Sequence, residues 1–231
     1  MFFPFYDSTY ILVLIGVIVS MMASAKLNAT YQRYSAVRSM CGLTGAEAAK
    51  RLLNSQGIYD VTIRRVPGSL TDHYDPRSKT VNLSDAVYGS TSIAAIGVAA
   101  HECGHAVQHA RAYAPLRMRS ALVPPVSFAS KVMPWLLLAG ILMIQTFPVL
   151  MLIGIVLFAL TTLFSFVTLP VEIDASRRAV AWLDSANITT AETKPMAKDA
   201  LRSAAYTYVV AALGSLATLI YYILIFTSRR D

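Results

Sequence analysis

Two histidines and a glutamate near the middle of the chain have the spacing of a catalytic zinc site. The run His101-Glu102-Cys103-Gly104-His105 matches the pattern HExxH. Four residues along a helix turn through about 400°, so the two imidazoles would lie on one face, one turn apart. Both rings can then reach one zinc ion, with Glu102 beside them as a general base for water. These residues predict one zinc ion per chain and hydrolytic chemistry.

The residues around this motif favour a helix. The segment Ser92–Ala110 is rich in alanine, lacks proline and has one apolar face, so we predict a single helix that carries the motif. Cys103 lies about 200° around such a helix from His101 and should face the core. The longer zinc pattern HExxHxxGxxH is excluded, because Gln108 and Arg111 occupy the positions of its glycine and third histidine.

A third ligand must come from elsewhere in the chain, because a catalytic zinc usually has three protein ligands and one open position. The acidic candidates are Glu172 and Asp174, which lie just past a long apolar segment. Their spacing alone leaves both open. An oxyanion formed during hydrolysis would need a further donor, for which the candidates are His73, Tyr74, Arg177 and Arg178. His73, Asp174, Arg177 and Arg178 are also candidates to contact the metal ligands.

Long apolar segments dominate the composition. Apolar residues make up 55% of the chain and charged residues only 14%, against about 25% in soluble domains. Four segments are suited to span a membrane: Tyr10–Leu27, Val132–Gln145 (with a second candidate start near Pro125), Pro148–Leu169 and Tyr206–Phe226. Only a short link separates the second from the third, so these two predict a transmembrane hairpin.

We therefore predict an integral membrane protein, mainly α-helical, with about four transmembrane helices and a small α+β zincin-like catalytic domain. The domain should contain a helix at Gly45–Ser55 and strands at Val61–Val66 and Thr80–Leu83. The second of these strands precedes the zinc helix and is a candidate to pair with substrate backbone. The predicted parts are an N-terminal anchor (1–27), the catalytic domain (28–131), the hairpin (132–169), the segment with the third ligand (170–205) and a last helix with its tail (206–231).

The charge pattern predicts an orientation. Lys26 and the two polar segments, 28–131 and 171–202, hold 18 of the 20 lysines and arginines, which favours the cytoplasmic side for both segments. A hairpin would return the chain to the face where the histidines lie. The basic residues are scattered, so the net charge of +7 predicts no nucleic-acid partner. The expected partners are protein or peptide substrates and the lipid bilayer.

The order of these features resembles the integral-membrane gluzincins of the HtpX type. Those proteins carry HExxH, a transmembrane hairpin and then E-x-x-A-D, whose glutamate completes the zinc site. The resemblance implies that Glu172 is the ligand, in preference to Asp174, with Ala175 at the alanine position. Ser176 stands where the family has aspartate.

Three stretches resemble the YugP family of bacterial neutral zinc metallopeptidases more closely. They are Leu70–Arg77, Ser92–Glu102 and Glu172–Ala179, within a resemblance that covers 31–201. It implies a membrane-bound zinc endopeptidase.

Two other functions stay open at this point. One is an intramembrane-cleaving protease, which would place the motif within a transmembrane helix and use an Asp-Gly ligand; the chain contains no Asp-Gly dipeptide. The other is a non-catalytic zinc-binding scaffold or adaptor in the membrane. Glu102 argues against the scaffold, because a purely structural zinc site has no need of a base.

Overall fold

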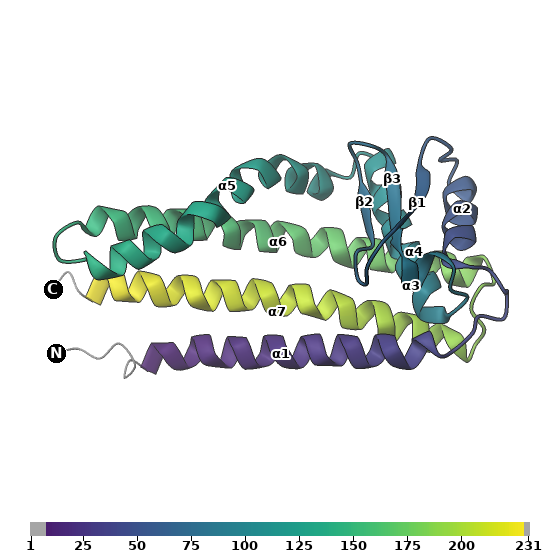
Figure 1. Cartoon of the computed structure of the whole chain (residues 1–231), viewed down its shortest axis with the longest axis horizontal. Helices are drawn as coiled ribbons and strands as arrows, with labels where there is room; N and C mark the ends of the chain where they lie inside the picture. The colour runs from purple at the N-terminus through teal and green to yellow at the C-terminus, as the bar shows by residue number, and fades with distance from the viewer. Residues whose placement is uncertain (1–7, 229–231) are drawn as a thin grey trace. The chain divides into compact units, whose positions relative to one another are not determined.

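The computed structural model describes residues 8–228 (Figure 1). Among these residues, four helices are long and apolar enough to cross a membrane: α1 (Ser8–Ser35), α5 (Ala114–Leu142), α6 (Pro148–Ser185) and α7 (Thr193–Ser228). The shorter elements are α2 (Gly45–Ser55), β1 (Thr62–Val66), β2 (His73–Asp75), β3 (Thr80–Ser84), α3 (Asp85–Tyr88) and α4 (Ile93–Ala110). The predicted fold class, a mainly helical membrane protein with a small α+β part, is confirmed.

All four long helices extend beyond the apolar segments that predict them. Helix α6 begins at Pro148 as expected but continues well past Leu169. Helix α5 begins at Ala114, ahead of both expected starts, Val132 and Pro125, and it accommodates three prolines. It ends at Leu142, just before the expected end at Gln145. The helices are longer than the apolar segments because hydropathy marks only the apolar residues, whereas backbone hydrogen bonds continue through polar ones.

The described chain forms two compact units. Unit 1 contains the described residues up to 23, residues 118–169 and those from 207 onward; unit 2 contains residues 24–117 and 170–206. Each long helix contributes its more apolar part to unit 1 and its more polar part to unit 2.

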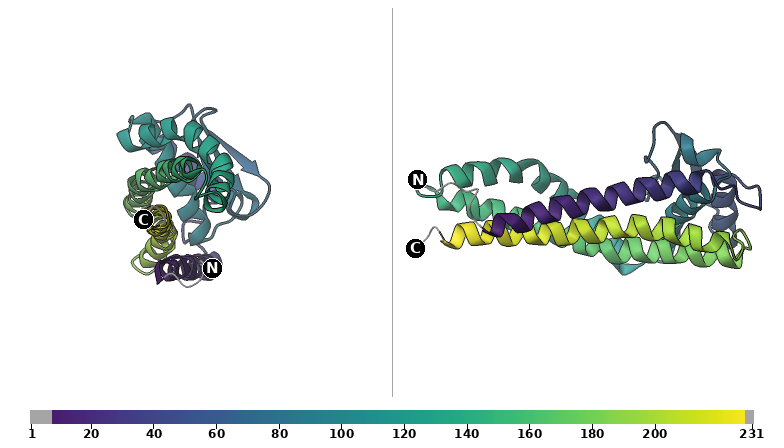
Figure 2. Two further views of the ribbon diagram at one scale, coloured as in Figure 1. Left: turned by 90° about the vertical axis from the view of Figure 1, so that its left-hand side faces the viewer. Right: turned by 90° about the horizontal axis from the view of Figure 1, so that it is seen from below.

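Unit 1 is built around the predicted hairpin of α5 and α6. A tight turn joins them, in which the Phe147 amide donates to the Met143 carbonyl over 2.7 Å (Figures 1 and 2). A side chain at Gly140 would place its Cβ 2.6 Å from the backbone of Met151, so the two helices approach closely only because this residue is glycine. Leu137 and Ile155 belong to the small buried core that results.

Unit 2 contains a three-stranded sheet in the order β1–β3–β2. The central strand β3 pairs parallel with β1 and antiparallel with β2, and all five of its residues are buried. The expectation that Thr80–Leu83 pairs with substrate is therefore wrong, because both of its sides are already hydrogen-bonded. Strand β2 was not expected from the sequence, since its three residues, His-Tyr-Asp, show no apolar alternation.

The core of unit 2 lies between this sheet, α2, α4 and the polar ends of α6 and α7. Helix α2 begins at Gly45 as predicted. Thr44 caps it: its hydroxyl accepts from the Glu47 amide, while the Glu47 carboxylate accepts from the Thr44 amide. Its apolar face packs Leu52 and Leu53 into the core. These contacts hold α4, which carries the HExxH motif, against its neighbours.

Candidate metal centre

Helix α4 places the two histidines of the motif side by side. The Ser92 hydroxyl accepts from the Ala95 amide and begins the helix where the sequence predicts. The ring centroids of His101 and His105 lie 4.8 Å apart, nearly edge to face. Cys103, on another side of the helix, is fully buried with its thiol directed at the Ala49 carbonyl, as expected for a core residue.

Glu172 of α6 faces both imidazoles. Its Oε2 atom lies 3.2 Å from His101 Nε2 and 3.6 Å from His105 Nε2, and only 2% of its side chain is exposed. One ligand atom from each of the three residues falls within 4.8 Å of the others. Ligand atoms around a tetrahedral zinc with bonds of about 2.0–2.1 Å lie about 3.3 Å apart. The donor set and its spacing therefore fit a zinc ion.

Close packing of α6 on α4 brings Glu172 to this position. A Cβ atom at Gly104 would lie 2.8 Å from the Ala175 carbonyl oxygen and 3.1 Å from the Ala175 Cα atom. Ala175 is itself fully buried. Gly104, the second variable position of HExxH, is thus the point where the two helices touch. Its partner Ala175 lies about one turn of α6 from Glu172.

Asp174, the other acidic candidate, takes part in a different set of contacts. Its carboxylate accepts hydrogen bonds from Gln108 Nε2 at 3.0 Å, from Arg177 at 2.6 Å and from Arg178 at 2.5 Å. The Arg177 side chain is 77% exposed, whereas that of Arg178 is largely buried. Both arginines named as candidates from the sequence thus contact Asp174 instead of meeting the histidines directly.

Two residues that sequence reasoning did not assign to the site contact the outer nitrogens of the histidines. Ser176 Oγ lies 3.1 Å from His101 Nδ1, and Gln108 Oε1 lies 3.1 Å from His105 Nδ1. Ser176 occupies the aspartate position of the gluzincin pattern, which is a signal that was available. Gln108 follows His105 by three residues and so lies on the same side of α4, which is a second available signal.

The electrostatics of the motif depend on its burial. Glu102 is buried beside the histidines. Burial by itself lowers the pKa of His105, but the neighbouring carboxylates of Glu172 and Glu102 outweigh it and raise this pKa above the ordinary value. Burial, with a smaller contribution from Glu102, strongly raises the pKa of the Cys103 thiol, which is therefore inert at neutral pH.

His73 lies in β2 and uses both ring nitrogens in local contacts. Its Nδ1 atom is 2.8 Å from the Thr71 carbonyl, and its Nε2 atom is 3.1 Å from Asn82 Nδ2. The neighbouring Tyr74 hydroxyl instead contacts His109 Nδ1 over 2.8 Å, and burial raises the pKa of Tyr74 to about 12. His73 therefore supports the sheet, while Tyr74 connects it to the end of α4.

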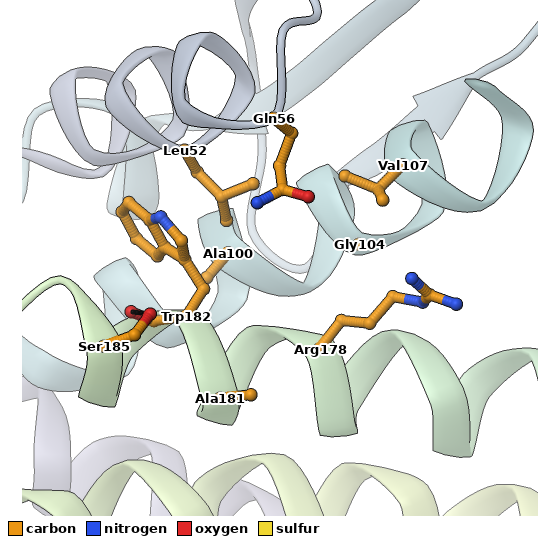
Figure 3. A pocket seen from close by; sticks show the side chains of 9 residues that line it. All are labelled: Leu52, Gln56, Ala100, Gly104, Val107, Arg178, Ala181, Trp182 and Ser185. Atoms are coloured by element: carbon orange, nitrogen blue, oxygen red, sulfur yellow. Dashed lines mark hydrogen bonds between the residues drawn. The ribbon is translucent and has the colours of Figure 1, made fainter. Parts of the chain in front are cut away.

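A cavity of about 330 Å³ adjoins the contact between α4 and α6 (Figure 3). Gly104 and Trp182 line it, together with Leu52 and Gln56 of α2. The three candidate metal ligands are not among its lining residues. The Arg178 guanidinium, which binds Asp174, does line it, so this cavity adjoins the outer contacts of the site.

Comparison with known proteins agrees with these features. Residues 9–227 match the model of a family described as "Putative neutral zinc metallopeptidase". The chain is also 43% identical over 213 residues to the "Putative membrane protease YugP" of Bacillus subtilis. The aligned region covers 92% of this chain and 94% of that protein. No solved structure matches it. With a family model that spans nearly its whole length, this chain belongs to the neutral zinc metallopeptidase family that its motifs resemble.

Proposed function

We propose that this protein is a membrane-bound zinc endopeptidase in which His101, His105 and Glu172 hold one zinc ion and Glu102 is the general base. The observation that carries the proposal is the convergence of two Nε2 atoms and one buried carboxylate oxygen at the spacing of a tetrahedral zinc site. A purely structural site would have no use for Glu102, which lies buried next to two of the ligands.

Glu102 performs the proton transfers of the reaction. When bound, zinc supplies a Lewis acid that polarises the scissile carbonyl and makes water a nucleophile near neutral pH. The Glu102 carboxylate accepts a proton from the attacking water and later donates it to the leaving amine. Its burial in unit 2 keeps the carboxylate close to the reacting atoms and away from bulk water.

The substrates in this proposal are membrane proteins or protein segments next to the membrane. The basic residues of unit 2 favour the cytoplasmic side. Among residues 8–228, α4 is not one of the helices suited to cross a membrane, which argues against cleavage inside the bilayer. Peptide bonds would thus be cut outside the hydrocarbon region, close to it.

The decisive experiment compares the wild-type chain with Glu102→Gln in otherwise identical cells. Membrane fractions are analysed for protein termini that depend on the intact enzyme, and the purified proteins are analysed for zinc. We expect about one zinc per chain in both proteins, and substrate cleavage only in the wild type. His101→Ala and His105→Ala should lose most of the zinc. Full zinc retention in both histidine variants, or wild-type cleavage by Glu102→Gln, would refute the proposal.

A further inference from the structure

Gln108 of α4 contacts His105 from the side away from Glu172, and both the oxygen and the nitrogen of its amide have hydrogen-bond partners. None of its surface is exposed. Its Oε1 atom meets His105 Nδ1, while its Nε2 atom donates to the Val171 carbonyl over 2.8 Å and to Asp174 over 3.0 Å. A buried amide with this many partners has a defined direction.

The partners of Gln108 determine which way its amide faces. The Val171 carbonyl and the Asp174 carboxylate only accept hydrogen bonds, so the NH₂ group of Gln108 must face them. The amide oxygen is then left for His105. An amide oxygen cannot donate, so the proton of the shared hydrogen bond has to lie on His105 Nδ1.

The charges further out hold this direction in place. Arg177 and Arg178 both donate to Asp174, over 2.6 and 2.5 Å, and so favour its ionised, purely accepting form. A continuous chain of donors and acceptors therefore runs from Arg178 through Asp174 and Gln108 to His105. At its inner end it leaves the lone pair of His105 on Nε2, the atom that faces Glu172 at 3.6 Å.

We propose that Gln108 is a positioning residue that fixes the Nδ1-protonated tautomer of His105 and thereby prepares Nε2 to bind the metal. This inference rests on the proposed zinc site. A neutral imidazole has two tautomers, and only the one with its proton on Nδ1 presents Nε2 as a ligand. Asp174 acts on the metal through Gln108, two hydrogen bonds away, and not as a ligand.

The test uses the full chain in detergent without metal, with its histidines labelled with ¹⁵N. The chain contains only four histidines, so their ring nitrogens can be resolved by NMR. At a pH high enough for the imidazole to be neutral, His105 of the wild type should carry its one proton on Nδ1. Gln108→Met has similar length but offers only a weakly accepting thioether sulfur in place of the amide oxygen, so His105 should then populate both tautomers. His101 is the internal control. Its Nδ1 atom contacts Ser176 and not Gln108, so its tautomer should be the same in the wild type and in Gln108→Met.

A second variant separates positioning from a merely structural role. Gln108→Glu keeps an oxygen for His105 but places a carboxyl group against Asp174, so it should unfold at a lower temperature than Gln108→Met. If Gln108 acts through the tautomer, Gln108→Glu keeps the Nδ1 proton and wild-type zinc affinity or better. Gln108→Met instead binds zinc about 10–100-fold more weakly, the usual effect of losing such a contact.

The opposite order of zinc affinities in the two variants would overturn the inference. If zinc affinity follows thermal stability, so that Gln108→Glu binds more weakly than Gln108→Met, Gln108 is only a packing residue. Unchanged tautomer and affinity in Gln108→Met would refute it equally. His105→Ala tells the two proposals apart: zinc retention in that variant refutes the metal site itself, whereas zinc loss there with wild-type binding by Gln108→Met refutes only the role of Gln108.

Discussion

Glu102 and Glu172 are carboxylates of the same chemistry in different surroundings. Glu172 has both imidazoles within 3.6 Å of one oxygen, which fits its proposed role as a ligand. Glu102 is covalently next to His101 on α4 and lies outside the group of three converging ligand atoms. A glutamine at each position keeps the shape of the side chain but removes its charge and its ability to take a proton, so the same substitution should have different consequences at the two sites.

Glu102→Gln should keep its zinc and lose about 10²–10⁴-fold in the rate of proteolysis, the usual share of general acid–base catalysis. Glu172→Gln should lose activity chiefly through weaker zinc binding, so that added zinc restores part of it. Zinc content is measured beside cleavage of an unfolded model substrate. Equal zinc loss in the two variants would contradict this division of roles.

Asp174→Asn should reduce zinc binding less than Glu172→Gln. Its carboxylate contacts Gln108, Arg177 and Arg178, so its influence on the metal is indirect. Titration of each purified variant with a zinc chelator gives the order of affinities. If Asp174→Asn empties the site while Glu172→Gln leaves it filled, the assignment of the third ligand is wrong by two residues.

Among the site residues, the sequence predicts those related by a short spacing along one helix. It misses those that are far apart in the chain and come together only in the folded protein. His101 and His105 are four residues apart on one helix, so their proximity follows from helix geometry. The choice of Glu172 over Asp174 needed the resemblance to known peptidases. The contact of Ser176 with His101 bridges two helices far apart in the chain, so only its place in the gluzincin pattern, and no helix spacing rule, could have pointed to it.

The contact between α4 and α6 sets the geometry of the site as a whole. Gly104 leaves room for the Ala175 backbone, so the helix with the histidines and the helix with Glu172 pack almost backbone to backbone. Close packing of this kind transmits small displacements, because a well-packed interior cannot absorb an additional methyl group without movement.

Gly104→Ala should therefore push α6 away from α4 and weaken zinc binding, at a cost of about 1–3 kcal/mol in stability. Gly97→Ala is the matched control on the same helix, since a Cβ atom there meets nothing within 4 Å. That change should keep full zinc content and stabilise the helix by up to about 1 kcal/mol. Thermal unfolding and zinc content are measured for both variants. Normal zinc affinity in Gly104→Ala would show that the close approach is not needed.

Elements with a strong local pattern were predicted well, and those that depend on partners were not. Helix α2 has both its capping residues and its apolar face in the sequence, and both of its predicted ends are correct. Strand β2 exists because β3 pairs with it, and its own residues do not predict it. The long helices exceed their apolar segments because their polar ends pack in unit 2, a tertiary effect that hydropathy does not report.

At the scale of the whole molecule, the charge pattern predicts that unit 2 faces the cytoplasm. Single cysteines introduced at Ser69 and Asn187, both exposed turn residues of unit 2, should react with a membrane-impermeant maleimide only in permeabilised cells. Phe147, 59% exposed in the turn between α5 and α6, is the control and should react in intact cells when replaced by cysteine. Cys41 and Cys103 are removed beforehand.

Different accessibility at Ser69 and Asn187 would contradict the hairpin, because an even number of crossings between them is required. The same accessibility at all three positions would show that α5 and α6 do not cross the membrane. A reversed pattern, with Phe147 protected in intact cells, would leave the fold unchanged and overturn only the orientation.

The division of the metal ligands between α4 and α6 also has a consequence for synthesis of the protein. The ribosome completes both histidines and the base long before it reaches Glu172. A growing chain would thus offer zinc only two of the three proposed ligands until α5, the turn and α6 as far as Glu172 have been made and folded back. With Glu172 as the proposed third ligand, a complete zinc site, and with it proteolytic activity, would be delayed until the hairpin has formed.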